Sequence, residues 1–114
     1  MPYLNIQTNQ KIDKAAGTSL LSSASKLVAS ELGKPESYVM VALETDIPML
    51  FAGSDAPLAY LELKSIGLPE GKTATLSAAL AKLMVETLGV SQERVYIEFA
   101  NAKGAMWGWN GATF

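Results

Sequence analysis

The sequence contains neither cysteine nor histidine. The absence of cysteine excludes a disulfide framework, a thiolate nucleophile, CxxC redox chemistry and a thiolate metal site. The absence of histidine excludes Ser-His and Cys-His dyads and imidazole zinc sites. If the protein is an enzyme, its chemistry is limited to carboxylates, lysine, tyrosine, the single Arg94 and the N-terminal amine. We therefore expect neither a metal nor a cofactor.

Strong charge of one sign and long apolar runs are also absent. The net charge is -2, and the scattered lysines and glutamates form neither a basic stripe for nucleic acid nor a polybasic membrane-surface helix. No apolar run approaches the roughly 20 residues that a membrane helix requires. The first residues, MPYLNIQTNQ, lack the charged and hydrophobic regions of a signal peptide. We expect a cytoplasmic protein that binds a small molecule or another protein, and neither nucleic acid nor membrane.

An internal repeat is the clearest pattern that the sequence does contain. The pair Leu32-Gly33 recurs 56 residues later as Leu88-Gly89, and each glycine stands where a left-handed C-cap residue belongs. The apolar residues before each pair follow the i, i+4, i+7, i+8 spacing of one helix face, which predicts two helices of about 18 residues. These residues are Leu20, Ala24, Leu27, Val28 and Leu32 in the first copy, and Leu76, Leu80, Leu83, Met84 and Leu88 in the second.

Strand-like segments lie on both sides of each predicted helix. In the first half they are residues 3–8 and 38–43, and in the second half residues 59–64 and 95–99. Strand, helix, strand is the parallel crossover unit, which is right-handed in nearly all proteins. We predict the α/β (α+β) class, with two βαβ repeats that form a four-stranded sheet and place both helices on one face.

The organisation that follows is a single domain over residues 1–114. The repeats cover about residues 2–45 and 58–100, and residues 101–114 form a tail. Two tryptophans and a terminal phenylalanine make this tail too apolar to lie free in solvent. We expect it to pack against the body, a neighbouring subunit or the rim of a ligand pocket. Plain core or interface packing explains these aromatic residues equally well.

The second predicted strand raises the question of what covers the sheet. Residues 39–43 are apolar at successive positions, which is typical of a strand buried on both faces. Two helices cover only one face of a four-stranded sheet, and another subunit is the simplest cover for the other. The alternative is a central strand beneath the loop of residues 47–57.

Five short motifs, spread in order along the whole chain, resemble one known family. They are the N-terminal Met-Pro, Gly33-Lys34-Pro35 followed by Tyr38, Ser65-Ile66-Gly67, Arg94-Val95-Tyr96-Ile97, and Gly108-Trp109-Asn110 with Thr113-Phe114. Together they resemble the macrophage migration inhibitory factor family, and specifically a bacterial-type member of this branch of the tautomerase superfamily. The resemblance implies a homotrimer whose three sheets enclose a central channel, with pockets between adjacent subunits. It also implies a keto-enol tautomerase for phenylpyruvate-like aromatic acids.

Pro2 matches the N-terminal proline that serves as general base in this family. Such a base needs a pKa near the working pH, and burial and a nearby cation both lower the pKa of an amine. The ring nitrogen is basic only after Met1 has been removed. The alternative role of Pro2 is to permit that removal and to begin a strand without needing an N–H group.

Two further motifs match positions that bind the substrate carboxylate in the family. Lys34 resembles the lysine that pairs with the carboxylate, and its charge would also lower the pKa of Pro2. Its alternative is a favourable charge at a helix C-terminus. Ser65 and Ile66 resemble the loop whose backbone N–H, at the isoleucine, binds the same carboxylate. An ordinary turn at the end of a strand is the alternative.

Aromatic residues account for the rest of the implied pocket. Tyr96 resembles the tyrosine that the neighbouring subunit supplies, whose hydroxyl hydrogen-bonds the substrate, although a half-buried aromatic on a strand is the alternative. Three residues match positions that line the pocket, and core packing explains each nearly as well. They are Tyr38, Trp109 and Phe114.

Several positions depart from the family pattern. Glu98 stands where vertebrate members carry a pocket asparagine, so a neutral group becomes an anion that either repels the substrate carboxylate or acts as a second acid/base. Trp107 replaces a small aliphatic residue, and Tyr3 replaces a methionine beside Pro2; both reshape the pocket. Residues 57–61 correspond to the family's CxxC segment and contain no cysteine, which excludes thiol oxidoreductase activity.

Two other functions compete with the tautomerase. A cytokine-like protein that binds a receptor would retain only a vestigial pocket, and receptor binding leaves no readable motif. Related isomerases or dehalogenase-type enzymes keep the N-terminal proline but depend on additional arginines. This chain has one arginine, which favours that group of enzymes least.

Overall fold

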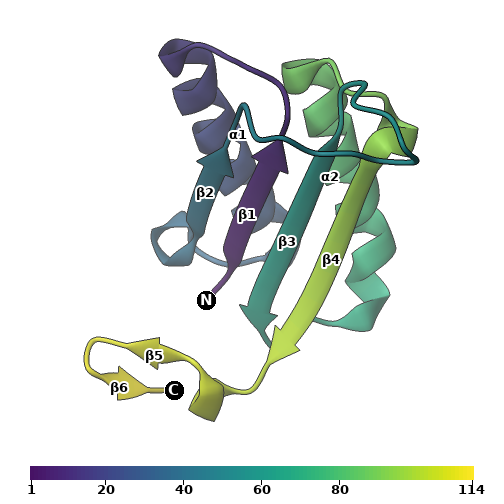
Figure 1. Cartoon of the computed structure of the whole chain (residues 1–114). Coiled ribbons are helices and arrows are strands. Elements are labelled where there is room, and N and C mark those ends of the chain that lie inside the picture. The colour runs from purple at the N-terminus through teal and green to yellow at the C-terminus, as the bar shows by residue number, and fades with distance from the viewer.

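Two βαβ units form one four-stranded sheet in the computed structural model, which describes residues 1–114. The first unit contains β1 (Tyr3–Thr8), α1 (Lys14–Leu32) and β2 (Met40–Glu44). The second contains β3 (Ala59–Ile66), α2 (Thr73–Leu88) and β4 (Val95–Ala102). The strand order is β2-β1-β3-β4. Each unit pairs its own strands in parallel, and the antiparallel pair β1–β3 joins the units at the centre (Figure 1). The predicted fold class is confirmed.

The helix ends follow the capping signals of the sequence. Asp13 caps the N-terminus of α1 by accepting a hydrogen bond from the Ala16 N–H at 2.8 Å. Gly33 and Gly89 end the helices in the left-handed conformation, with φ values of 63° and 65°. A side chain with a Cβ would be strained at either position. A short 3-10 turn follows each cap, Glu36–Tyr38 in the first unit and Gln92–Arg94 in the second, so the repeat extends beyond the helices.

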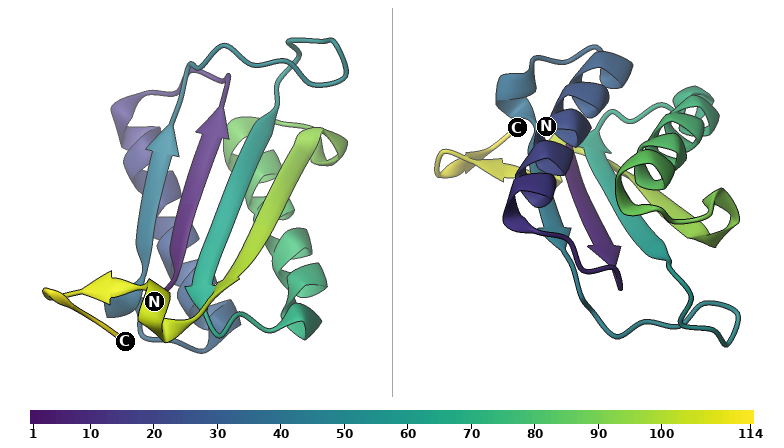
Figure 2. Two further views of the ribbon diagram at one scale, coloured as in Figure 1. Left: turned by 60° about the horizontal axis from the view of Figure 1, so that its bottom comes forward. Right: turned by 90° about the horizontal axis from the view of Figure 1, so that it is seen from above.

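The hydrophobic core lies between the sheet and the two helices, which cover the same face (Figure 2). Alternate residues of β1 and β3 are buried there, including Leu4, Ile6, Leu61 and Leu63. The predicted helix faces meet them. Burial of one such side chain contributes about 1.5–3 kcal/mol. The fully or nearly fully buried helix residues in this cluster are Leu20, Ala24, Val28, Leu76, Leu80, Met84 and Leu88.

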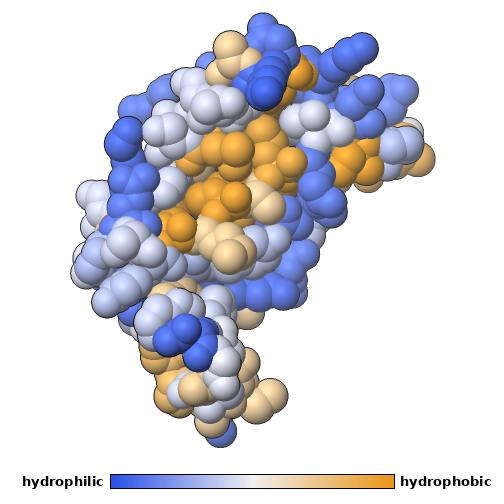
Figure 3. Space-filling view, turned by 90° about the vertical axis from the view of Figure 1, so that its left-hand side faces the viewer, coloured by the Kyte–Doolittle hydropathy of each residue, from blue (hydrophilic) through white to orange (hydrophobic).

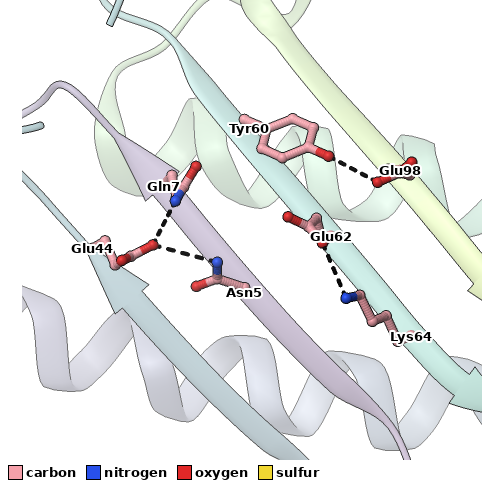
Figure 4. A network of polar contacts seen from close by, with 7 residues as sticks. All are labelled: Asn5, Gln7, Glu44, Tyr60, Glu62, Lys64 and Glu98. Carbon is pink, nitrogen blue, oxygen red and sulfur yellow. Dashed lines mark hydrogen bonds and ion pairs between the residues drawn. The ribbon is translucent and has the colours of Figure 1, made fainter. Parts of the chain in front are cut away.

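The opposite face of the sheet is polar rather than apolar. Figure 4 shows the polar contacts on this face. Gln7 and Asn5 donate to the Glu44 carboxylate at 2.7 and 3.3 Å, the Tyr60 hydroxyl donates to Glu98 at 3.0 Å, and Lys64 lies 3.4 Å from the Glu62 carboxylate. Such side chains suit a face that contacts water or a polar channel.

The second strand differs from its prediction. Tyr38 belongs to a 3-10 turn, the strand begins only at Met40, and Met40 is 66% exposed. Residues 39–43 are therefore not buried on both faces within one chain. The loop of residues 47–57 passes over the ends at which β3 and β4 begin, and it does not cover β2 (Figure 1). β2 is an edge strand, and hydrophobic side chains gather on this side of the molecule (Figure 3).

The tail folds back beneath the sheet. A 3-10 turn (Gly104–Met106) leads into a hairpin of β5 (Gly108–Trp109) and β6 (Ala112–Thr113). Asn110 and Gly111 adopt positive φ values at the hairpin tip, as a two-residue type I′ turn requires. Both chain termini lie at this end of the molecule (Figure 2). Neither α1 nor α2 is long and apolar enough to cross a membrane.

Candidate active site at the N-terminus

Two adjoining cavities lie where β1 and β2 begin and β3 ends. The larger measures about 550 Å³ and is lined by the N-terminus, residues 37–40 and residues 107–109. The smaller measures about 290 Å³, and its lining includes Lys34, Ile66 and Phe114. Met1, Tyr38 and Trp109 line both cavities. The larger cavity has a size typical of small-ligand sites.

Pro2 is fixed at the centre of this region. Its side chain is fully buried, and its carbonyl accepts a hydrogen bond from the Met40 N–H at 3.0 Å. The next residue, Tyr3, pairs with Met40 on one side and with Lys64 on the other. The first peptide of β1 is thus held by both neighbouring strands, which gives the N-terminus a defined position at the cavity wall.

The N-terminal amine has a lowered pKa. Burial disfavours the charged form and lowers the pKa of the Met1 amine below its ordinary value of 8.0, and the positive charge of Lys34 lowers it further. This combination of burial and a nearby cation produces an amine that is more easily neutral near pH 7.

Lys34 reaches the smaller cavity because of the turn that ends α1. The left-handed Gly33 reverses the chain, and the Lys34 N–H donates to the Ala29 carbonyl at 2.9 Å. Ile66 lines the same cavity from the end of β3. Ser65 lies differently, because its side chain is fully buried on the helix-covered face and its hydroxyl donates to the Ile66 carbonyl at 3.3 Å. Within Ser65-Ile66, only Ile66 lines the cavity.

Aromatic side chains form much of the remaining wall. Tyr38 comes from the 3-10 turn before β2, and Tyr3, Trp107 and Trp109 line the larger cavity. Trp109 stacks on Phe114 with ring centroids 6.0 Å apart and an interplanar angle of 21°. The tail therefore lies at the rim of the pocket, as one of the sequence interpretations predicts.

Tyr96 and Glu98 lie away from this pocket. Tyr96 faces Tyr60 near the start of β3 and Glu98 faces Glu62 in its middle, whereas Tyr3 faces Lys64 near its end. Lys64 follows Tyr60 by four positions, which corresponds to about 13 Å along the strand. Tyr96 is 65% exposed. Neither side chain lines the two cavities beside Pro2 within a single chain, and both residues are exposed.

Comparison with known proteins identifies the family. A family model described as "Macrophage migration inhibitory factor (MIF)" matches residues 1–114. The chain belongs to the macrophage migration inhibitory factor (MIF) family.

Several relatives match this MIF-family chain over its full length. It is 39% identical to the MIF homolog of Trichuris trichiura and 40% identical to that of Trichinella spiralis, each over 115 residues and with all of both chains covered. The solved structure of the Prochlorococcus marinus MIF homologue superposes with a TM-score of 0.93 at 40% identity, covering 98% of each chain. The Trichinella spiralis MIF structure has a TM-score of 0.90 at 38% identity, covering 98% of this chain and 99% of that one.

Family membership explains the exposed surfaces of the single chain. The MIF fold suggests an oligomer, and a homotrimer is consistent with it. The uncovered β2 edge, the polar sheet face and the exposed Tyr96 all suit contacts with further copies.

Sequence reasoning missed part of the pocket. Ser37, Val39 and Met40 line the larger cavity, but the sequence alone places residues 38–43 in a strand. The signal that would have found them is strand pairing, because the residues opposite Tyr3 in a parallel neighbour must lie beside Pro2. Phe51, whose ring centroid lies 4.6 Å from that of Tyr96, was missed because it lies in a loop without regular pattern, far from Tyr96 in the sequence.

Proposed function

We propose that the chain, after removal of Met1, is a keto-enol tautomerase that acts on phenylpyruvate-like aromatic 2-keto acids in the cytoplasm. Pro2 is the general base. The observation that carries the proposal is the N-terminal amine, whose pKa is lowered first by burial and then by Lys34, at a cavity of ligand size.

When Met1 is removed, the ring nitrogen of Pro2 becomes the N-terminal amine. Pro2 is fully buried while Met1 is present, and burial disfavours the charged form of an amine at this position. Only the neutral amine accepts a proton, and a lowered pKa increases the neutral fraction near pH 7. While Met1 is retained, the same nitrogen is a tertiary amide and is not basic.

The reaction moves one proton within the substrate. The Pro2 nitrogen takes a proton from the carbon beside the carbonyl, the C–H electron pair forms the C=C bond, and the carbonyl oxygen becomes an enolate oxygen. Protonation of that oxygen gives the enol. The Lys34 ammonium and the Ile66 backbone N–H hold the carboxylate and stabilise the negative charge that develops nearby.

The remaining residues shape the pocket around the substrate. The aromatic ring of the substrate packs against Tyr38, Trp109 and Phe114, because these side chains line the cavities. Tyr3 and Trp107 narrow the larger cavity, and Ser65 supports Ile66 from the core side.

An adjacent subunit of the homotrimer completes the pocket. It supplies the Tyr96 hydroxyl, which donates to the substrate, and the Glu98 carboxylate. The exposure of Tyr96 and its distance along the sheet from its own Pro2 support this arrangement.

Tautomerisation of phenylpyruvate by the Met1-processed protein, measured over about pH 5 to 9, tests the proposal. Mass spectrometry first establishes the state of the N-terminus. We expect activity that depends on a group titrating near neutrality, with strong loss in Pro2→Gly and in the form that retains Met1. Equal activity with Met1 retained would exclude Pro2 as the base.

An inert processed protein would favour a different role. The alternative is a cytokine-like receptor-binding protein with a weak or vestigial pocket, and the anionic Glu98 is the feature that favours it. Binding to a receptor without turnover of any aromatic 2-keto acid would support that alternative.

A further inference from the structure

The only arginine of the chain holds the loop between β2 and β3. The Arg94 guanidinium donates to the carbonyl oxygens of Pro57, Phe51, Ser54 and Ala56, at 3.0, 3.2, 3.0 and 3.0 Å. No carboxylate pairs with it. A guanidinium presents five N–H donors in a rigid fork, and here four hydrogen bonds from one side chain fix residues 51–57.

The part of the loop that Arg94 holds is a strained turn. Phe51 and Ser54 exchange two backbone hydrogen bonds, both 3.0 Å long. Ala52 and Gly53 between them have φ values of 54° and 73°, the geometry of a type I′ turn. Alanine is poorly suited to positive φ. Arg94 binds the carbonyls on both sides of the turn and so supports a conformation that its own residues do not favour.

A direct chain of contacts connects this turn to Tyr96. The guanidinium carbon of Arg94 lies 5.2 Å from the centroid of the Phe51 ring. The Phe51 ring lies 4.6 Å from the Tyr96 ring at an interplanar angle of 50°. Tyr96 is otherwise largely exposed, so Phe51 is the aromatic support that restricts its ring.

We propose that Arg94 is a positioning residue for substrate binding, which holds Phe51 and thereby orients Tyr96 toward the pocket of the adjacent subunit. This inference rests on the proposed function, in which Tyr96 donates its hydroxyl to the neighbour's substrate. Arg94 touches no substrate itself and acts through Phe51.

Asn9 provides a matched control because it holds the same loop from the other side. Its side chain donates to the Asp55 carbonyl at 2.8 Å and accepts from the Leu58 N–H at 3.1 Å. None of the hydrogen bonds of the Asn9 side chain involves Phe51 or Tyr96. A variant of Asn9 therefore weakens the loop without removing the support of Tyr96.

The experiment compares Arg94→Lys with Asn9→Ser in the Met1-processed protein. Lysine keeps the charge but cannot form the four bonds of the fork. We expect Arg94→Lys to raise KM for phenylpyruvate about fivefold with little change in kcat, as loss of one substrate hydrogen bond would. The pH profile of kcat/KM should not move in Arg94→Lys, because the N-terminal amine lies at the other end of the sheet. Asn9→Ser lowers the thermal midpoint but leaves KM unchanged.

A second background distinguishes positioning from general loop damage. In Tyr96→Phe, which lacks the hydroxyl, Arg94→Lys should have no further effect on KM. Phe51→Leu leaves the Arg94 hydrogen bonds in place and should raise KM as Arg94→Lys does. Combined with Tyr96→Phe, it should have no further effect on KM. It serves as the test if Arg94→Lys fails to fold. Equal KM increases in Arg94→Lys and Asn9→Ser, or additive effects with Tyr96→Phe, would overturn the inference.

A readout without turnover separates this inference from the proposed function. Carbon-13 labelling of the tyrosine rings reports the Tyr96 environment by NMR, whether or not the protein is active. Arg94→Lys should shift or broaden the Tyr96 ring signal, and Asn9→Ser should not. If the wild-type protein is inert, the proposed function fails while this measurement still decides whether Arg94 positions Tyr96; an unchanged signal would contradict it.

Discussion

The hydroxyl of Tyr60 donates a hydrogen bond to the Glu98 carboxylate at 3.0 Å across the open face of the sheet. This bond is the largest cause of a raised pKa at Tyr60, because an ionised phenol would lose the hydrogen bond and face the negative charges of Glu62 and Glu98. The Glu98 carboxylate therefore changes the titration of its neighbour.

We predict that Glu98→Gln lowers the pKa of Tyr60 toward its ordinary value. The variant removes a charge and weakens the hydrogen bond that favours the neutral phenol. Alkaline titration followed by phenolate absorbance measures the change. Glu62→Gln is the graded control, because Glu62 contributes only through its charge, and it should lower the pKa less. An equal shift in both variants would contradict the role of the hydrogen bond.

Lys34→Ala should move the pH profile of kcat/KM to higher pH. The Lys34 charge lowers the pKa of the N-terminal amine, after the larger effect of burial. Under the proposed function, activity requires the neutral amine and rises as pH rises through that pKa. Removal of the Lys34 charge raises this pKa, so the rising limb moves to higher pH. KM should also increase about 10- to 100-fold, because Lys34 is the proposed partner of the substrate carboxylate.

Lys34→Arg is the control for this prediction, because it preserves the positive charge and the rising limb should stay in place. A profile that does not move in Lys34→Ala would show that burial alone sets the pKa of the amine.

Gly104→Ala should disturb the aromatic rim of the pocket. A Cβ at Gly104 would lie 3.0 Å from the Phe114 carbonyl oxygen and 3.2 Å from its Cβ, where the Phe114 N–H also donates to Gly104. Displacement of Phe114 loosens its stack on Trp109, and we expect KM for phenylpyruvate to rise about two- to tenfold. Tryptophan fluorescence and steady-state kinetics measure the effect. Gly71→Ala, where a Cβ meets nothing within 4 Å, should change neither.

Ala52→Asn should stabilise the protein by about 0.5–1 kcal/mol, because Ala52 holds a φ of 54° that asparagine tolerates better. Its side chain is exposed, so no packing is lost. Denaturant unfolding at a fixed chain concentration measures the difference, since the stability of an oligomer depends on concentration. An unchanged or lower free energy of unfolding would mean that the turn is not strained at this position.

The helices and the class of fold could be predicted because their signals are local. The spacing that begins at Leu20 and again at Leu76 marks the buried face of each helix, and Gly33 and Gly89 mark the ends. Each of these signals lies within a few helical turns, where the local sequence largely determines the conformation.

The position of Tyr38 could not be predicted in the same way. Its apolar neighbours suggest a strand, but hydrogen bonds from Tyr38 N–H to the Pro35 carbonyl and from Val39 N–H to the Glu36 carbonyl close a 3-10 turn first. That turn directs Tyr38 into the cavity. Short turns of this kind depend on where the chain must go next, which is a long-range property.

The candidate site was accessible to sequence reasoning only through resemblance. Pro2 and Lys34 come close because β1 begins where α1 ends. The spacing of apolar residues along the sequence does not predict this proximity. The burial of Ser65 on the helix side follows from strand alternation, and the phase of that alternation is fixed by Leu61 and Leu63. The support of Tyr96 by Phe51 depends on a loop with no regular pattern.

The location of Pro2 and Tyr96 at opposite ends of one sheet has a genetic consequence. Under the proposed arrangement, a chain defective in Pro2 still offers a normal Tyr96 to its neighbour, and a chain defective in Tyr96 still carries a normal Pro2. Coexpression of the two defective alleles would form mixed trimers. In these trimers, an intact Pro2 from one variant would lie beside an intact Tyr96 from the other. Activity would then recover through intragenic complementation, although neither allele is fully functional alone.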